Sequence, residues 1–217
     1  MAKKSVKKGI FITFEGPEGC GKTTHSKLLY DYLTKLSYAS VYTREPGGTK
    51  VGEKIRDVLL HSNEIHISDL TELFLFESAR AQIVEEVIRP ALLKKRIVIC
   101  DRYADASLSY QGYGARLPLK IIAALNDIST GLLKPDLTIL LDIDTLTGLK
   151  RAESKGIDRM QMKKIAYHKR VRIGYLKLAK KDPRRIKVIR LADNIKETQR
   201  RIIREVGCVI QRYNRAG

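Results

Sequence analysis

Five short apolar runs alternate along this chain with longer segments whose apolar residues recur at helical spacing. The short runs are continuous and rich in β-branched residues, which is typical of strands buried on both faces of a sheet. They span residues 9–15, 40–44, 96–100, 137–142 and 186–191. Helical spacing is clearest over residues 23–36, where Leu29, Leu33 and Leu36 share one face.

Further helices complete the alternation. They are predicted over residues 51–60, 69–93, 118–129 and 145–180, and from residue 194 onward. Because proline has no amide hydrogen, we expect the second of these to be interrupted at Pro90. Strands alternating with helices indicate an α/β fold with a doubly wound, parallel, five-stranded sheet. Ligands of such a sheet bind at the carboxyl ends of its strands.

Length and composition indicate one folded unit. The chain has 217 residues, 43% apolar and 30% charged, which is enough to bury a core. We expect residues 9–217 to form a single domain and the basic residues 1–8 to be a disordered tail. No stretch approaches the roughly 20 apolar residues that a membrane helix needs. The residues before position 15 also lack the apolar core and cleavage site of a secretory signal.

The cysteines indicate a reducing compartment. Cys20, Cys100 and Cys208 lie far apart and show no CxxC spacing. An odd, sparse set of this kind argues against a disulfide scaffold or a zinc site, and the four histidines form no metal-binding pattern. We therefore expect a cytoplasmic protein.

Basic residues are concentrated in the last third. The net charge is +18, but residues 150–217 alone carry 22 basic and six acidic side chains, a net of +16. Such asymmetry indicates a surface that meets polyanions, either nucleic acid or the phosphates of a nucleotide. A solvated basic helix face is the simpler interpretation of many of these residues.

A phosphate-binding motif follows the first predicted strand directly. It reads G-x-x-x-x-G-K-T and opens the first helix, which is the context that a P-loop requires. Lys22 is expected to contact the β- and γ-phosphates, and the Thr23 hydroxyl to ligate Mg²⁺. The expected ATP-binding residues are Gly16, Pro17, Glu18, Gly19, Cys20, Gly21, Lys22, Thr23 and Thr24. The spacing does not fit the dinucleotide fingerprint, so NAD is disfavoured.

A second group of candidate residues follows the other strands, on the side where a molecule that accepts a phosphate would bind. Asp101 and Arg102 come directly after the third strand, where an aspartate can hold a magnesium-bound water and an arginine can clamp a phosphate. Phe76 and Arg80 are an i, i+4 pair that can stack on a base and donate to its carbonyl. Taken alone, Phe76 is more often a core residue, because Leu73 and Leu75 lie beside it in sequence. Ser107, Tyr110 and Gln111 add polar groups, and Arg56 lies on the helix after the second strand.

Read together, these segments resemble the thymidylate kinase family, in its bacterial form. The segments that carry the resemblance are FEGPEGCGKTT, TREPGGT, ELFLFESARAQ, ICDRY, the expected loop ASLSYQGYG, LKPDLTILLD and YLKLA. The resemblance implies transfer of the γ-phosphate of ATP to dTMP, with Mg²⁺, and a homodimer.

The resemblance also implies roles on the acceptor side. Glu18 would face the sugar 3′-hydroxyl and the acceptor phosphate, and Tyr110 would pack on the deoxyribose. Phe76 would stack on thymine, and Arg80 would donate to a base carbonyl. Ser107 would hydrogen-bond to the base edge, and Gln111 would support the base pocket. Arg56 and Arg102 would bind the acceptor phosphate. Asp101 would organise magnesium and its waters.

The segment at residues 151–167 corresponds to the family's lid and departs from its usual pattern. Lys155 stands where the resemblance places a catalytic arginine, and Gln161 stands where a glutamate is usual. Lysine lacks the planar fork of arginine, so the exchange matters at a bidentate site. Lys155 is the positional match, and Arg151 and Arg159 are the alternatives for the catalytic cation.

Two other functions stay open on the sequence alone. One is a kinase for a different pyrimidine nucleoside monophosphate. The other is a nucleotide-gated protein that binds nucleic acid through its basic last third, which the absence of a nucleic-acid reader motif disfavours.

Overall fold

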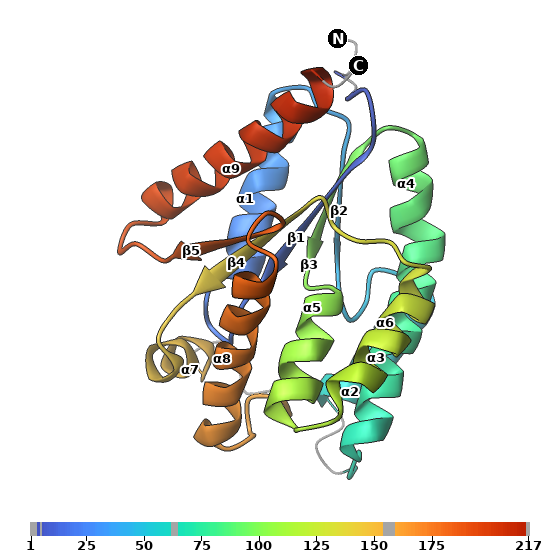
Figure 1. Ribbon diagram of the computed structural model, residues 1–217, viewed down its shortest axis with the longest axis vertical. Coiled ribbons are helices and arrows are strands. Elements are labelled where there is room, and N and C mark those ends of the chain that lie inside the picture. The colour runs from blue at the N-terminus through green and yellow to red at the C-terminus, as the bar shows by residue number, and fades with distance from the viewer. Residues whose placement is uncertain (1–3, 5, 62–64, 154–158, 216–217) are drawn as a thin grey trace.

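The computed structural model describes residues 4, 6–61, 65–153 and 159–215. Its centre is a parallel sheet with strand order β2-β3-β1-β4-β5 (Figure 1). The strands are β1 (Ile10–Glu15), β2 (Ser40–Arg44), β3 (Ile97–Asp101), β4 (Leu137–Asp142) and β5 (Ile186–Arg190). Their ends fall within one residue of the predicted runs, and the predicted α/β fold with a doubly wound, five-stranded parallel sheet is confirmed.

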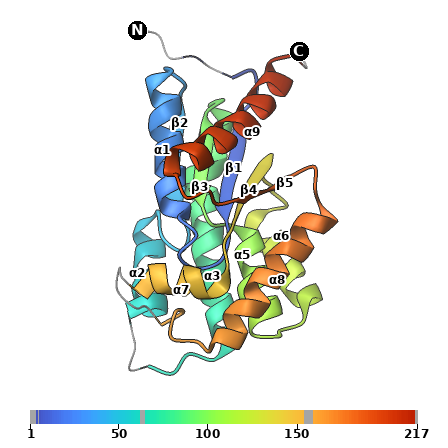
Figure 2. The same ribbon diagram turned by 90° about the vertical axis from the view of Figure 1, so that its left-hand side faces the viewer.

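Side chains that alternate along the strands pack on two different helical layers, one on each face of the sheet. Ile12 and Phe14 of β1 pack on helices α1 (Lys22–Lys35) and α9 (Ile195–Arg215), which lie side by side (Figures 1 and 2). Phe11, the residue before Ile12, packs on the opposite layer. Successive side chains of a strand point to opposite faces, so the continuous apolar run of β1 serves both layers.

The second layer is larger and is built around two helices. Ile83 of α3 (Asp69–Ile83) joins the cluster on β3, and Tyr175 of α8 (Ile165–Lys181) joins the cluster on β4. Helices α2 (Lys50–His61) and α6 (Leu119–Thr130) pack on α3. Within the ranges described above, no helix is both long and apolar enough to span a membrane.

The predicted interruption at Pro90 is wrong. The helical run continues from α3 through a π-helical turn, η1 (Val84–Ile88), into α4 (Arg89–Leu93). The wider turn bonds the amide of residue 89 to the carbonyl of residue 84, five positions back. Proline then falls in the first turn of α4, where its missing amide hydrogen costs little.

The predicted loop at residues 106–114 is also wrong. This segment is helical, as α5 (Ala104–Ser107) followed by the π-helical η2 (Leu108–Gly114). It lacks the apolar periodicity of a helix because its stability comes from contacts with α8. Arg170 donates to the carbonyl oxygen of Gly114 at 2.6 and 3.0 Å. A Cβ atom at position 114 would lie 2.7 Å from the ring of Tyr167, so glycine permits this close packing.

The predicted helical stretch at 145–180 contains two helices, α7 (Thr145–Glu153) and α8. The lid candidate at 151–167 includes the last residues of α7 and the first residues of α8. Lys155 lies outside the described residues. At the other end of the chain, the predicted disordered tail is partly wrong. Val6 is buried in the core, and Lys4 forms a parallel bridge with Tyr38, because an apolar residue there completes the cluster under β1.

Candidate active site

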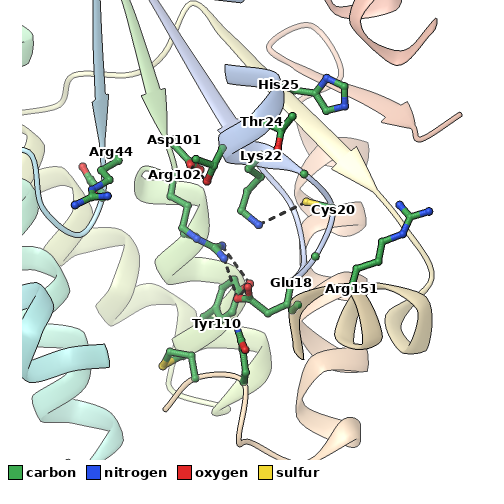
Figure 3. A pocket seen from close by; sticks show the side chains of 18 of the residues that line it. Glu18, Cys20, Lys22, Thr24, His25, Arg44, Asp101, Arg102, Tyr110 and Arg151 are labelled. Carbon is green, nitrogen blue, oxygen red and sulfur yellow. Dashed lines mark hydrogen bonds and ion pairs between the residues drawn. The ribbon is translucent and has the colours of Figure 1, made fainter. Parts of the chain in front are cut away.

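The carboxyl ends of β1, β2 and β3 open onto one cavity of about 620 Å³ (Figure 3). Most of the predicted site residues line it, although they come from distant parts of the chain. These are Glu18, Gly19, Cys20, Gly21, Lys22, Thr23, Thr24, Arg56, Phe76, Asp101, Arg102, Ser107, Tyr110, Gln111 and Arg151. The parallel sheet therefore gathers them as the position of its strand ends predicts.

The loop between β1 and α1 has the geometry of a phosphate cradle. Gly16 and Gly19 have φ angles of 144° and 66°, a region that favours glycine. A Cβ atom at Gly19 would lie 1.9 Å from the carbonyl oxygen of Gly148, so glycine lets the loop rest on α7. The Nζ of Lys22 donates to the carbonyl oxygens of Gly16 (3.0 Å) and Pro17 (2.8 Å), which lie behind the cavity lining. A buried positive charge thus lies inside the loop, beside the N-terminus of α1.

Thr23 and Asp101 form a set of hard oxygen donors at the edge of the cavity. The Thr23 hydroxyl donates a hydrogen bond to the Asp101 carboxylate. Hydroxyl and carboxylate oxygens suit Mg²⁺, so the residues present fit this ion. In the part of the chain that the structure describes, no three His, Cys, Asp or Glu side chains are grouped to hold a metal by themselves. Magnesium would therefore depend on phosphate and water oxygens as further ligands.

Glu18 of the loop forms a connected cluster with Arg102 and Tyr110 (Figure 3). Glu18 Oε1 accepts hydrogen bonds from Arg102 Nη2 at 2.8 Å and from the Tyr110 hydroxyl at 2.6 Å. The guanidinium also lies 4.9 Å from the centre of the Tyr110 ring. Burial raises the pKa of Glu18, but the charges of Arg102 and Lys22 outweigh it and hold the pKa at about 2. The carboxylate is therefore ionised at neutral pH.

Arg80 lies behind the cavity wall and is not part of its lining. It is 1% exposed, and its Nε donates to Glu45 at 2.8 Å. Its Nη1 donates to Glu77 at 2.5 Å and to the Ser107 hydroxyl at 2.9 Å. Burial raises the pKa of Glu45 to about 7, with Arg80 opposing the shift. In this arrangement Arg80 orients Ser107, which does line the cavity, and direct contact of Arg80 with a base stays a prediction.

Phe76, Gln111 and Arg56 complete the acceptor side. Phe76 is half-buried and packs on the core cluster of α8 while also lining the cavity, so both interpretations of this residue hold in part. Gln111 Nε2 donates to Glu72 at 2.9 Å. Arg56 Nη1 donates to the carbonyl oxygen of Pro46 at 2.9 Å, and burial lowers the pKa of Arg56.

The three candidates for the lid cation have different positions. Arg151 lies on α7 beside the phosphate loop and lines the cavity (Figure 3). Arg159 does not line it; its side chain donates to the carbonyl oxygen of Leu59 at 2.9 Å and to Glu72. Lys155 is not among the described residues. Of the two arginines, only Arg151 therefore lies at the cavity.

Sequence reasoning missed the part of the cavity between α1 and α9. Its lining comes from α1, from the connection that follows β5 and from the first turn of α9: His25, then Leu191, Ala192 and Asp193, then Ile195 and Thr198. His25 bonds to Gln199 of α9 at 2.8 Å, and burial lowers its pKa. Its position after the carboxyl end of the fifth predicted strand could have indicated a ligand-binding segment. The connection carries no recognisable motif, so the sequence alone did not identify it as part of the site. Arg44, at the end of β2 and within the TREPGGT segment, also lines the cavity.

Comparisons with known proteins agree with this geometry. Residues 14–202 match the family model described as thymidylate kinase. A thymidylate kinase from Geotalea uraniireducens is 44% identical over 198 residues, covering 88% of this chain and 93% of the relative. One from Dehalococcoides mccartyi is 49% identical over 176 residues, covering 81% and 85%. The crystal structure of thymidylate kinase from Ehrlichia chaffeensis is similar with a TM-score of 0.78 and 33% identity, covering 92% of this chain and 99% of the other. Sequence and fold therefore agree: the chain belongs to the thymidylate kinase family.

Proposed function

We propose that this chain transfers the γ-phosphate of ATP to dTMP, giving dTDP and ADP for dTTP synthesis. The observation that carries the proposal is that one cavity joins a phosphate loop to a second, separate set of nucleotide-binding side chains. Lys22 lies on one side, and Phe76, Arg102 and Tyr110 lie on the other. A hydrolase that releases phosphate to water has no need of the second set.

ATP would bind with its phosphates in the loop and its adenosine toward the connection after β5. The loop amides and Lys22 would contact the β- and γ-phosphates. The donors of Thr23 and Asp101 fit Mg²⁺, which when bound neutralises charge on those phosphates. The lining residues His25 and Leu191 would border the adenosine. ATP thereby spans the distance from α9 to the centre of the cavity.

The acceptor would bind with its base on Phe76 and its phosphate toward the loop. Ser107 and Gln111 offer hydrogen-bonding groups to the base edge. Tyr110 would pack on the deoxyribose and disfavour a 2′-hydroxyl. The match to the thymidylate kinase family supports a pyrimidine deoxynucleotide as this acceptor.

Positioning and charge account for the chemistry. Transfer breaks the bond between the γ-phosphorus and the β–γ bridging oxygen and forms one to an oxygen of the acceptor phosphate. Arg56 and Arg102 would hold the acceptor phosphate in line, and Arg151 would balance charge that develops on the transferred group. The acceptor phosphate is already largely ionised near pH 7, so the reaction needs no strong general base.

We also propose that the chain acts as a homodimer in a reducing cytoplasm. Helices α3 and α6 lie side by side and expose large apolar residues (Figure 1). These are Leu70, Phe74, Ile121 and Ile128, each about half exposed or more. A second copy that covers them would remove this surface from water. The cysteines Cys20, Cys100 and Cys208 are all free, which suits a reducing compartment.

The test is release of ADP from ATP and Mg²⁺ with dTMP, dUMP, dCMP, dGMP, UMP or water as the acceptor. Selective release with dTMP, together with detection of dTDP, is the expected result. Faster release with another pyrimidine monophosphate would assign the enzyme to that substrate. Equal, slow release with every acceptor would contradict a kinase function, and salt-sensitive binding of RNA or DNA would then be measured next.

A further inference from the structure

Glu72, in the first turn of α3, is fully buried and is shared by three side chains from two other parts of the chain. Its Oε1 accepts a hydrogen bond from Gln111 Nε2 at 2.9 Å. Its Oε2 accepts one from Arg159 Nη2, and Lys163 Nζ lies 3.2 Å from the same oxygen. One carboxylate therefore joins η2 to the segment that precedes α8.

Gln111 and the neighbours of the two cations border the same cavity. Gln111 lines it on the acceptor side. Met160 and Gln161 line it as well, and they lie in sequence between the two cations that bind Glu72. We refer to residues 159–163 as the docking segment. Glu72 thus holds the docking segment and an acceptor-site residue at the same time.

Other contacts place the docking segment on the same surface. Arg159 Nε donates to the carbonyl oxygen of Leu59 at 2.9 Å. Lys163 lies 3.3 Å from Asp69 and 4.7 Å from the centre of the Tyr167 ring. Asp69 is half exposed, whereas Glu72 is completely enclosed. Glu72 is therefore the buried centre of the contact, and Asp69 lies at its rim.

A buried carboxylate is stable only while charged or hydrogen-bonding donors surround it. If the docking segment moved away, Glu72 would lose both cations and keep only Gln111 among these three donors. If Gln111 turned away, Oε1 would lose its closest donor. The positions of Gln111 and of the docking segment therefore depend energetically on each other.

We propose that Glu72 is a positioning residue that couples binding of the acceptor nucleotide, through Gln111, to placement of the docking segment against the cavity. The inference rests on the proposed function, in which Gln111 faces the acceptor base. An acceptor that holds Gln111 in place stabilises the cluster at Glu72 and with it the cavity wall at Met160 and Gln161. The phosphate loop lines the same cavity as Met160 and Gln161, so ATP then binds in a cavity whose wall is already in place, and by reciprocity ATP tightens binding of the acceptor.

The experiment measures the dissociation constant of a non-hydrolysable ATP analogue with and without saturating dTMP. The ratio of the two constants is the coupling factor, and for the wild type we expect it to lie in the range of about 5 to 150 that is usual for coupled sites. In Glu72→Gln we expect the factor to approach 1, because an amide cannot accept bonds from both cations and Gln111 together. A wild-type factor of 1 would overturn the proposal.

A matched control and a second variant separate coupling from stability. Asp69→Asn also removes a carboxylate that contacts Lys163, but it does not touch Gln111, so its coupling factor should equal that of the wild type. If Glu72→Gln fails to fold, as thermal unfolding will report, Gln111→Leu tests the same link from the acceptor side. A wild-type coupling factor in folded Glu72→Gln, or in Gln111→Leu, would overturn the proposal.

Failure of the coupling is distinguishable from failure of the proposed function. Formation of dTDP by the wild type tests the function and does not involve Glu72. An active wild type whose coupling factor survives both substitutions overturns only the role of Glu72. A wild type that neither binds nor phosphorylates dTMP overturns the proposed function itself.

Discussion

Arg102 reaches across the end of the sheet to Glu18, with 2.8 Å between Nη2 and Oε1. The backbone of Arg102 has a φ of 74°, in the left-handed region, directly after β3 ends. A residue with a Cβ atom is roughly 1–2 kcal/mol less stable in that conformation. The contacts with Glu18 and Tyr110 stabilise it and direct the guanidinium into the cavity. The phosphate loop and the acceptor side are therefore joined before any substrate binds.

Arg102→Lys should weaken acceptor binding selectively. Lysine keeps the charge but loses the fork that can bind Glu18 and a phosphate together. A lost hydrogen bond to a charged group costs about 1.5–3 kcal/mol, so we expect the KM for dTMP to rise about 10- to 100-fold. The KM for ATP should change less than about twofold. Initial rates over a range of dTMP concentrations measure this, with Arg200→Lys on the exposed face of α9 as the control. An unchanged KM for dTMP would count against the proposed role.

Lys22→Ala should reduce turnover by about 10²- to 10³-fold, the usual loss when one preorganised electrostatic contact is removed. The reason is that the Nζ of Lys22 lies inside the loop that would hold the transferred phosphate. Lys27→Ala, on an exposed position of the same helix, should leave kcat unchanged. Near-normal turnover with intact ATP affinity in Lys22→Ala would show that the loop does not act as proposed.

The lid cation is identified by comparing three variants. Arg151 lines the cavity, so Arg151→Ala should lower kcat at least tenfold with little change in either KM. Arg159→Ala should act differently from Arg151→Ala, because Arg159 donates hydrogen bonds to Glu72 and to the carbonyl oxygen of Leu59 and does not line the cavity. We expect it to raise the KM values and lower stability. A large loss of kcat in Lys155→Ala, with Arg151→Ala close to wild type, would assign the role to Lys155 instead.

Most of the fold was predictable from the sequence because its signals are local. Continuous apolar runs gave all five strands, and α3 begins where Ser68 caps it, accepting from the Thr71 amide at 3.2 Å. Helix α6 ends at Gly131, which has a φ of 55°. The helical geometry of η2 was not predictable, because it depends on α8, which is some 50 residues away in sequence, through Arg170 and Tyr167.

The candidate site was predictable as a set of residues but not as a set of contacts. Motifs placed Lys22 and Asp101 at the strand ends, and the sheet brought them to one cavity. Spacing along α3 put Phe76 and Arg80 on one face, but only tertiary packing determines that Arg80 points to Glu45 and Ser107 behind the wall. Pairing of charges across many residues has no local sequence signal.

Phe74→Glu should convert a dimer into a monomer. Phe74 is 49% exposed on α3, beside the apolar residues of α6, and a charge buried there without a partner would oppose association. Light scattering coupled to size-exclusion chromatography measures the mass. Ile173→Glu, which places the same charge at an equally exposed position of α8, should leave the mass unchanged. A monomeric wild type would remove the proposed homodimer.

Glu15→Gln should make the protein more stable at alkaline pH. Burial, followed by the charge of Asp105, raises the pKa of Glu15 to about 8, so the folded state holds this proton where the unfolded chain has lost it. The folded state then binds more protons between about pH 4.5 and 8, and the free energy of unfolding falls as the pH rises through that window. For this group the slope approaches about 1.4 kcal/mol per pH unit.

Glutamine mimics the protonated carboxyl toward Tyr175 and Tyr103, so Glu15→Gln should match the wild type near pH 5 and exceed it increasingly up to pH 8. Urea unfolding at a series of pH values gives the difference, and Glu85→Gln, on the exposed side of η1, should show none. Parallel pH profiles for wild type and Glu15→Gln would mean that Glu15 is ionised in the folded protein.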